Sequence, residues 1–127
     1  MKSEDRIQQD CVMWFRNEFP KLRGRLYSVP NGGLRNKREA MLLKSTGVYP
    51  GVSDLHLLVK EVINTENGVI KYPTTVYIEL KTEIGVQSDD QEEWQRLVED
   101  MGFIYYMIRT QVEFIKIVSL YYGEEDK

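Results

Sequence analysis

One stretch in the middle of the chain constrains the fold most. Residues 75–82, T-V-Y-I-E-L-K-T, alternate apolar residues with others, which is the pattern of a half-buried β-strand. Because successive side chains of a strand point to opposite faces, Tyr77, Glu79 and Lys81 share one face. A strand with apolar neighbours that places a carboxylate beside an amine calls for a structural or a chemical reason.

The rest of the pattern predicts helices and strands in the order α-β-α-β-β-α-β-α. Capping residues predict helices from Ser3 to about Glu18, from Asn36 to Gly47, from Ser88 to Met101 and from Thr110 to about Tyr122. Strands are expected at residues 25–29, 54–62, 69–81 and 103–109, with Pro73 as a point of interruption and a hairpin loop longer than two residues around Asn67–Gly68.

This order predicts one α/β (α+β) domain over residues 1–127. The strand at 103–109 is apolar nearly throughout, as in a strand covered on both faces. We therefore expect a mixed sheet flanked by helices, with one extra helix between the first two strands and another at the C-terminus.

Composition narrows the cellular setting and the metal chemistry. A single cysteine excludes an internal disulfide and fits a reducing cytoplasm. One histidine and one cysteine also exclude a zinc site built from those residues, so a metal would need oxygen ligands, which favours Mg²⁺, Mn²⁺ or Ca²⁺. No apolar run approaches the roughly 20 residues that span a bilayer, and the N-terminus lacks the apolar region of a signal peptide.

Charge is distributed unevenly along the chain. Residues 1–50 hold 10 Lys and Arg against 5 Asp and Glu, whereas residues 51–127 hold 7 against 15, so a net charge of −3 conceals a basic first half. A local basic patch can bind phosphate even in an acidic protein. A solvated basic surface explains the same pattern equally well.

Several acidic and amide residues occupy places where an apolar stripe would otherwise run. Glu4 and Gln8 extend the inward face of the first helix, and Gln91 extends that of the third. Asp54 begins one strand and Glu79 ends the next, so a hairpin would place their carboxylates side by side. Taken singly, each residue has an ordinary structural explanation: a helix-dipole partner, a capping residue, a turn residue or an exposed ion pair. Spacing alone decides little, since the tail residues Glu125 to Lys127 also match Glu-x-Lys.

Together these segments resemble a known family. P-G-V-S-D-L-H-L (50–57) and I-E-L-K-T (78–82) are similar to the PD-(D/E)xK nuclease core, and more closely to its VRR-NUC branch, the virus-type replication-repair nucleases. Further matches are Glu4, Gln8, Trp14, the stretch S-V-P-N-G-G, and Gln91 with Trp94. One departure is that three residues, 51–53, separate Pro50 from Asp54.

The resemblance implies an αβββαβ core, a divalent metal and hydrolysis of a phosphodiester in DNA. Asp54, Glu79 and the Leu80 carbonyl would hold Mg²⁺ or Mn²⁺, and Glu4 would add a carboxylate or orient the attacking water. Gathered without metal, such carboxylates repel one another, so we expect the site to be strained or partly protonated. Small stand-alone members of this family look like homodimers that cut branched DNA such as Holliday junctions, in bacterial or phage-infected cells.

The remaining roles follow from the same resemblance. Carboxylates favour the charged form of an amine, so we expect a protonated Lys81 that stabilises charge on the phosphate, with a role as base as the lesser alternative. Gln91 would position Lys81 or a phosphate, and Gln8 and Trp94 would support the site. The residues expected to contact the DNA backbone are Asn31, Gly32, Gly33, Arg35, Lys37, Arg38 and Lys44.

Other readings stay open at this point. The chain could be a DNA-binding or scaffolding module with a degenerate nuclease fold, or a small domain whose acidic half docks a basic partner. His56 shares the face of Asp54 and is either close to the metal or, more simply, a satisfied strand histidine. Cys11 reads as a core residue. Packing, not base stacking, is expected of five aromatic residues: Trp94, Tyr105, Tyr106, Tyr121 and Tyr122. Some of those in the last helix could form a dimer face.

Overall fold

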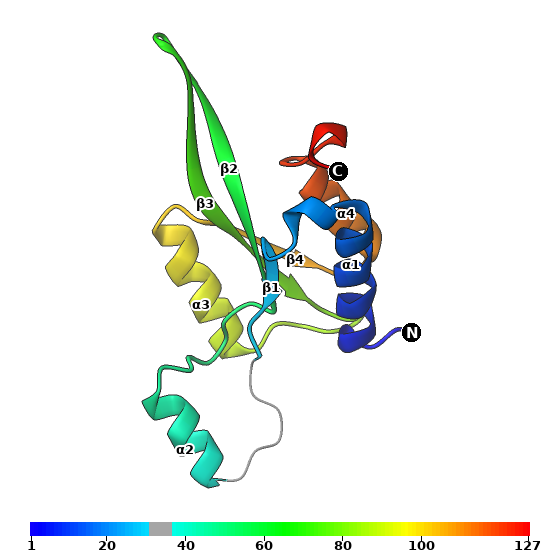
Figure 1. Ribbon diagram of the computed structural model, residues 1–127. Helices are drawn as coiled ribbons and strands as arrows, with labels where there is room; N and C mark the ends of the chain where they lie inside the picture. The colour runs from blue at the N-terminus through cyan, green and yellow to red at the C-terminus, as the bar shows by residue number, and fades with distance from the viewer. Residues whose placement is uncertain (31–36) are drawn as a thin grey trace.

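A four-stranded mixed sheet with helices on both faces forms the body of the protein (Figure 1). The computed structural model describes residues 1–30 and 37–127. The strands are β1 (Leu26–Ser28), β2 (Leu55–Thr65), β3 (Gly68–Leu80) and β4 (Ile104–Ile108). The helices are α1 (Glu4–Glu18), α2 (Lys37–Ser45), α3 (Asp89–Asp100) and α4 (Gln111–Ser119), with short 3₁₀ turns η1 (Pro20–Leu22) and η2 (Glu124–Asp126).

The sheet order is β1-β2-β3-β4. The first three strands pair antiparallel, and β4 pairs with β3 in parallel. The predicted α+β fold, with its mixed sheet, its extra helix after β1 and its C-terminal helix, is confirmed.

One face of the sheet packs on α1 and α4. Alternate residues of β2 and β3 point to this side, and those nearest the sheet centre are wholly buried: Leu55, Leu57, Val76, Ile78 and Leu80. Cys11 and Phe15 of α1 and Phe114 of α4 complete the core, as the helical spacing of apolar residues predicts. The other face carries α3, whose Trp94 makes edge contacts with the Tyr77 ring of β3, with the ring centroids 4.9 Å apart.

The helices follow the predicted capping residues, with one difference in where a helix ends and one in which residues a helix buries. The Ser3, Ser88 and Thr110 side chains each accept a hydrogen bond from the backbone of their helix. The last helix ends at Ser119, not near Tyr122, because the following amides tighten to carbonyls three residues back. The apolar stripe of α3 is narrower than predicted, since Trp94 and Val98 face the sheet while Leu97 and Met101 are exposed. In the described part of the chain, no helix has the length and apolar character needed to cross a membrane.

Strands β2 and β3 form a long hairpin that projects beyond the helices (Figure 1). Pro73 does not interrupt it but pairs with Lys60, and the loop is only two residues long, Glu66 and Asn67. The pairing of β1 and β4 ends before this part of the hairpin, so both of its edges are free and a proline without an N–H is tolerated there.

Helix α2 stands apart from the body of the protein. It lies beyond the end of the sheet at which β2 begins and β3 ends, and none of its residues is buried (Figure 1). The predicted cap Asn36 lies outside the described residues.

Candidate active site at the end of the sheet

The two predicted carboxylates meet where β2 begins and β3 ends. The pairing of Leu55 with Ile78 sets Asp54 next to Glu79 across the hairpin, as the sequence predicted. An Asp54 oxygen accepts a hydrogen bond from the Leu80 amide at 2.8 Å, and its carboxyl is also in hydrogen-bonding contact with that of Glu79. The hairpin therefore holds the pair rigidly from both strands.

Glu79 is completely buried. The Tyr105 hydroxyl donates to its Oε2 at 2.9 Å, and the Gln91 amide donates to its Oε1 at 3.3 Å. Burial, followed by the contact with Asp54, raises the pKa of Glu79 to about 8, although Tyr105 and Lys81 act in the opposite direction. At neutral pH and without a cation, Glu79 therefore holds a proton, which agrees with the protonation expected from the sequence.

Lys81 follows Glu79 on the same strand and is only 7% exposed. Its backbone amide donates to the Ile108 carbonyl at 3.0 Å, which extends the parallel ladder by one residue past β3. Its charge lowers the pKa of Glu79, so the amine and the carboxyl interact electrostatically. Glu79 and Lys81 are therefore a buried pair and not an ion pair on the surface of the strand.

The loop after Lys81 is held by Arg109, a residue that the sequence analysis did not single out. The Arg109 guanidinium donates from one nitrogen to the carbonyls of Thr82, Glu83 and Gly85, at 2.6, 3.3 and 2.8 Å. Arg109 directly follows β4, so the parallel pairing of β4 with β3 brings it to this loop. A sequence pattern carries no signal for such a contact, because it depends on which strands pair.

Gln91 performs two functions at once. Its backbone and side chain form a capping box with Ser88, while its amide nitrogen contacts Glu79. Among the described residues its side chain does not reach Lys81, one of the two partners predicted for it, the other being a phosphate. The turn before β2 approaches the first turn of α3 closely. Gly51 in this turn has φ +86°, and a Cβ there would lie 2.2 Å from the Asp90 carbonyl oxygen. Only glycine allows this turn to pack against the first turn of α3.

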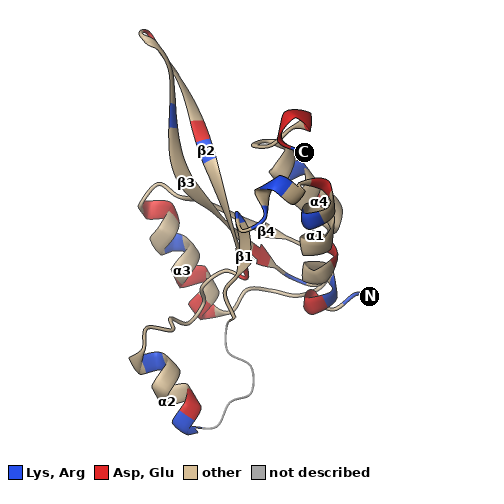
Figure 2. Ribbon diagram, viewed as in Figure 1, with Lys and Arg blue, Asp and Glu red and all other residues tan. Residues whose placement is uncertain are grey.

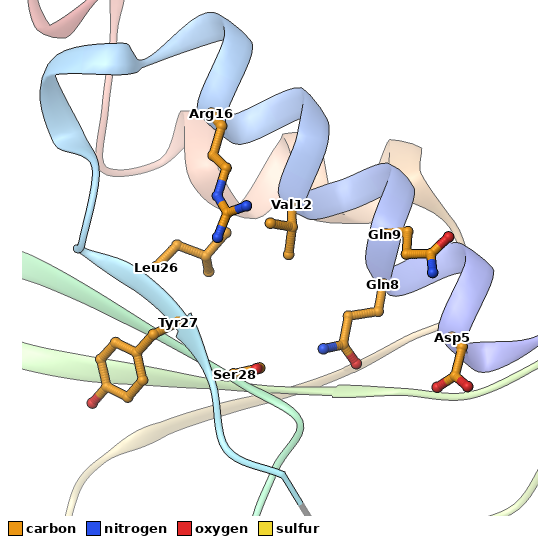
Figure 3. A pocket seen from close by; sticks show the side chains of 8 residues that line it. All are labelled: Asp5, Gln8, Gln9, Val12, Arg16, Leu26, Tyr27 and Ser28. Atoms are coloured by element: carbon orange, nitrogen blue, oxygen red, sulfur yellow. The ribbon is translucent and has the colours of Figure 1, made fainter.

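The α1 residues are separate from the carboxylate pair. Glu4 is the first residue of α1 and is partly exposed. Among residues 1–30 and 37–127, no three His, Cys, Asp or Glu side chains gather closely enough to hold a metal, so Glu4 does not form a triad with Asp54 and Glu79 there. Its role as a further ligand stays a prediction. Gln8 lines a cavity between α1 and β1 (Figure 3).

Aromatic side chains support Glu79 from the α3 face. Trp94 packs on Tyr77 and, with ring centroids 6.1 Å apart, on Tyr105, in agreement with the predicted packing role. Tyr105 also orients Glu79, a function that was not predicted. His56 lies in the same cluster with its Nδ1 3.4 Å from the Tyr27 hydroxyl. Its Nε2 is buried with no partner among the described residues, and burial lowers the pKa of His56, so the imidazole is neutral.

The residues predicted to contact DNA are only partly described. Lys37, Arg38 and Lys44 lie near the two ends of α2, beyond the carboxylate end of the sheet (Figure 2). The predictions for Asn31, Gly32, Gly33 and Arg35 lie outside the described residues.

The donor set at the end of the sheet suits a hard divalent cation. Asp54 and Glu79 offer adjacent carboxylate oxygens, and the Leu80 carbonyl is the predicted third ligand. Mg²⁺ is commonly bound by one or two carboxylates with water in its other positions. Each Glu79 oxygen accepts one hydrogen bond, from Gln91 or from Tyr105, which would orient the carboxylate and leave each oxygen able to accept a second partner.

The fold and the site together define an α+β domain with a mixed four-stranded sheet and a pair of contacting carboxyls at one end of it. No protein-family model matches the chain, and no curated protein matches it. A solved structure named "VRR_NUC domain protein" matches with a TM-score of 0.71 at 18% sequence identity, covering 95% of this chain and 88% of that one. The protein therefore has the fold of a VRR_NUC domain, and the resemblance expected from the motifs is confirmed at the level of the fold.

Proposed function

We propose that the protein is a Mg²⁺- or Mn²⁺-dependent endonuclease that hydrolyses phosphodiester bonds in DNA. The observation that carries this proposal is the contact between the Asp54 and Glu79 carboxyls, with Lys81 buried on the same strand. A buried carboxyl in contact with a second, partly buried one is unfavourable unless a cation or a proton compensates their charge. The VRR_NUC fold supports the same conclusion.

The chain's own residues would divide the work as follows. Asp54 and Glu79 would hold the cation, and Tyr105 and Gln91 fix the orientation of Glu79. The Lys81 ammonium would stabilise negative charge on the phosphate oxygens as water adds to phosphorus and the P–O bond to the leaving oxygen breaks. The cation supplies positive charge at the scissile phosphate and makes the attacking water more acidic. Glu4 would orient that water.

The substrate we propose is branched DNA such as a Holliday junction. A junction needs two symmetric nicks, and one 15.0 kDa protomer offers one site, so we propose a homodimer. We place the enzyme in the cytoplasm of a bacterial or phage-infected cell, in DNA repair or recombination. Sedimentation that finds only monomer at micromolar concentration would remove the junction substrate and leave the nuclease.

A cleavage assay with a lysine variant tests the assigned site. Four-way, flap and linear DNA are incubated with the protein and Mg²⁺, Mn²⁺ or EDTA. Lys81→Ala should lower the cleavage rate by roughly 100-fold or more while the DNA affinity changes by less than about threefold, because the amine stabilises charge that develops in the transition state. Lys60→Ala, an exposed lysine on the projecting hairpin, is the matched control and should cut normally.

Three results would contradict the proposal. Cleavage by Lys81→Ala at the wild-type rate would show that the site is elsewhere. DNA binding without cleavage under any metal condition would favour the alternative function, a DNA-binding or scaffolding module with a degenerate nuclease fold. Absence of salt-sensitive DNA affinity would exclude both.

A further inference from the structure

A cavity of about 310 Å³ lies between α1 and β1 (Figure 3). Gln8 and Arg16 extend from the helix toward the strand, and Leu26 forms part of the floor (Figure 3). Its volume is at the lower end of the range for sites that bind small ligands. The cavity can hold one nucleotide unit but not a base-paired duplex.

The polar side chains around the cavity are available to a ligand. Asp5, Gln8, Gln9, Arg16 and Ser28 have no hydrogen-bond or ion-pair partner among residues 1–30 and 37–127. Their neighbours behave differently, since Lys2 and Arg6 both pair with Asp10. The polar side chains of α1 that border the cavity are therefore all unpaired among the described residues.

The chemistry of these groups matches a nucleotide. Side-chain amides carry a donor and an acceptor side by side and pair with base edges, and a carboxylate accepts from an exocyclic amino group. A guanidinium is the side chain best suited to phosphate. Gln8 and Arg16 are eight residues apart, roughly 12 Å along the helix, so the base and the phosphate of one unit can contact different ends of the cavity.

The cavity adjoins the candidate active site through β1. Ser28 pairs with Leu55, the residue after Asp54, and the Val29 amide donates to the Asp54 carbonyl at 3.1 Å. Ser28, which lines the cavity, is therefore separated from Asp54 by a single residue of β2.

We propose that this cavity binds one unpaired nucleotide of the DNA strand, close to the scissile phosphate. This inference rests on the proposed nuclease function and adds its substrate class: DNA with an unpaired nucleotide beside the cut, as at a flap or an open junction. A fully paired duplex cannot deliver a base into the cavity, because the base edge is engaged by its complement. The cavity would thus select DNA that has an unpaired nucleotide, without recognising a long base sequence.

The test compares intact and abasic DNA. The cut in a flap substrate is first mapped with the wild-type protein, and each unpaired nucleotide flanking it is then replaced by an abasic unit. Binding is measured in the Lys81→Ala background with EDTA present. One abasic position should weaken binding by about tenfold, the effect of one good amide–base contact. In the Gln8→Leu variant the intact and abasic DNAs should bind alike, whereas Arg16→Ala should weaken the binding of both DNAs, because it removes a contact to the phosphate that both contain.

Controls separate this inference from the function on which it rests. Asn17→Leu, an amide on α1 outside the cavity, and Arg96→Ala, an exposed arginine on α3, should keep the tenfold difference. Circular dichroism checks that each variant is folded, and Gln8→Ala, a smaller change at the same position, replaces Gln8→Leu if that variant does not fold. Equal binding of intact and abasic DNA by a protein that cuts flaps would overturn the nucleotide site alone. Failure to bind or cut any DNA would overturn both.

Discussion

At the scale of single residues, Glu79 best illustrates how the fold creates chemistry. Complete burial of a carboxyl ordinarily costs free energy, and here the buried carboxyl also contacts a second one. Tyr105 and Gln91 compensate part of that cost by donating hydrogen bonds to both of its oxygens. What is left uncompensated favours either a proton or a cation at this position.

The pH dependence of folding should report this directly. The pKa of Glu79 is about 8 in the folded protein against an ordinary value of 4.5, so between these values the folded state binds more protons than the unfolded state. The metal-free protein should therefore lose stability as pH rises from about 5 to 8, by roughly 3 kcal/mol. Thermal unfolding in EDTA across this range measures the slope.

Two variants define what the slope means. Glu79→Gln should flatten it, since a neutral amide occupies the same space and has no proton to lose. Glu92→Gln, an exposed acid on α3, should leave it unchanged. A slope that persists in Glu79→Gln would contradict the assignment.

At the scale of elements, residues at the end of β4 fix the position of the loop that follows β3. Arg109 gathers three carbonyls of the loop after Lys81, and the Lys81 amide is bonded to Ile108. The loop therefore cannot shift without breaking charge-assisted hydrogen bonds. In this way the edge strand positions a lysine that it does not itself carry.

Removing the Arg109 guanidinium should lower the rate of catalysis more than substrate binding. Arg109→Met keeps the apolar stem and removes the donors, so we expect kcat to fall by roughly 10- to 100-fold while KM changes by less than about threefold. Arg109 acts through the loop and not on the substrate, which is why the effect should appear in kcat. Steady-state cleavage of a flap substrate measures both constants.

The matched control is Arg96→Met, an exposed arginine of α3 with no part in the site. A rise in KM with kcat unchanged would mean that Arg109 contacts DNA instead.

At the scale of the whole molecule, the basic residues do not form one patch. Lys37, Arg38 and Lys44 lie on α2, at the carboxylate end of the sheet, while Lys21 and Arg23 lie around η1 on the far side of the body (Figure 2). Of these two groups, only the α2 group lies at the end of the sheet that carries Asp54, where it could contact the phosphates of a DNA strand bound there. The acidic first turn of α3, with Asp89, Asp90 and Glu92, lies at the end of that helix nearest α2 (Figure 2).

Salt dependence should distinguish the two ends of the molecule. Replacing Lys37, Arg38 and Lys44 together by Ala should reduce the slope of log K against log salt by up to about 0.9 for each DNA phosphate that the variant no longer neutralises. Replacing Lys60 and Lys71, exposed on the projecting hairpin, should not change the slope. Titration of labelled flap DNA between low and moderate salt measures it. An unchanged slope in the α2 variant would exclude this helix from the DNA interface.

The sequence by itself determined the elements and the candidates. Alternation and capping residues predicted α1, β1 and α3 closely, because these signals depend on neighbours a few residues apart. The pairing of Asp54 with Glu79 was also within reach, since one hairpin joins them. The extents of β2, β3 and α4 were predicted less well, because edges and packing decide where such elements end.

Only the tertiary structure decided which distant groups meet. The contacts of Tyr105 with Glu79 and of Arg109 with the loop after Lys81 span 26 and up to 27 residues and depend on β4 pairing in parallel with β3. The separation of Glu4 from the carboxylate pair and the cavity beside Gln8 depend likewise on how α1 packs on the sheet. Side-chain period states which face a residue occupies, whereas the neighbour on that face is set by strand order and helix packing, which no local pattern encodes.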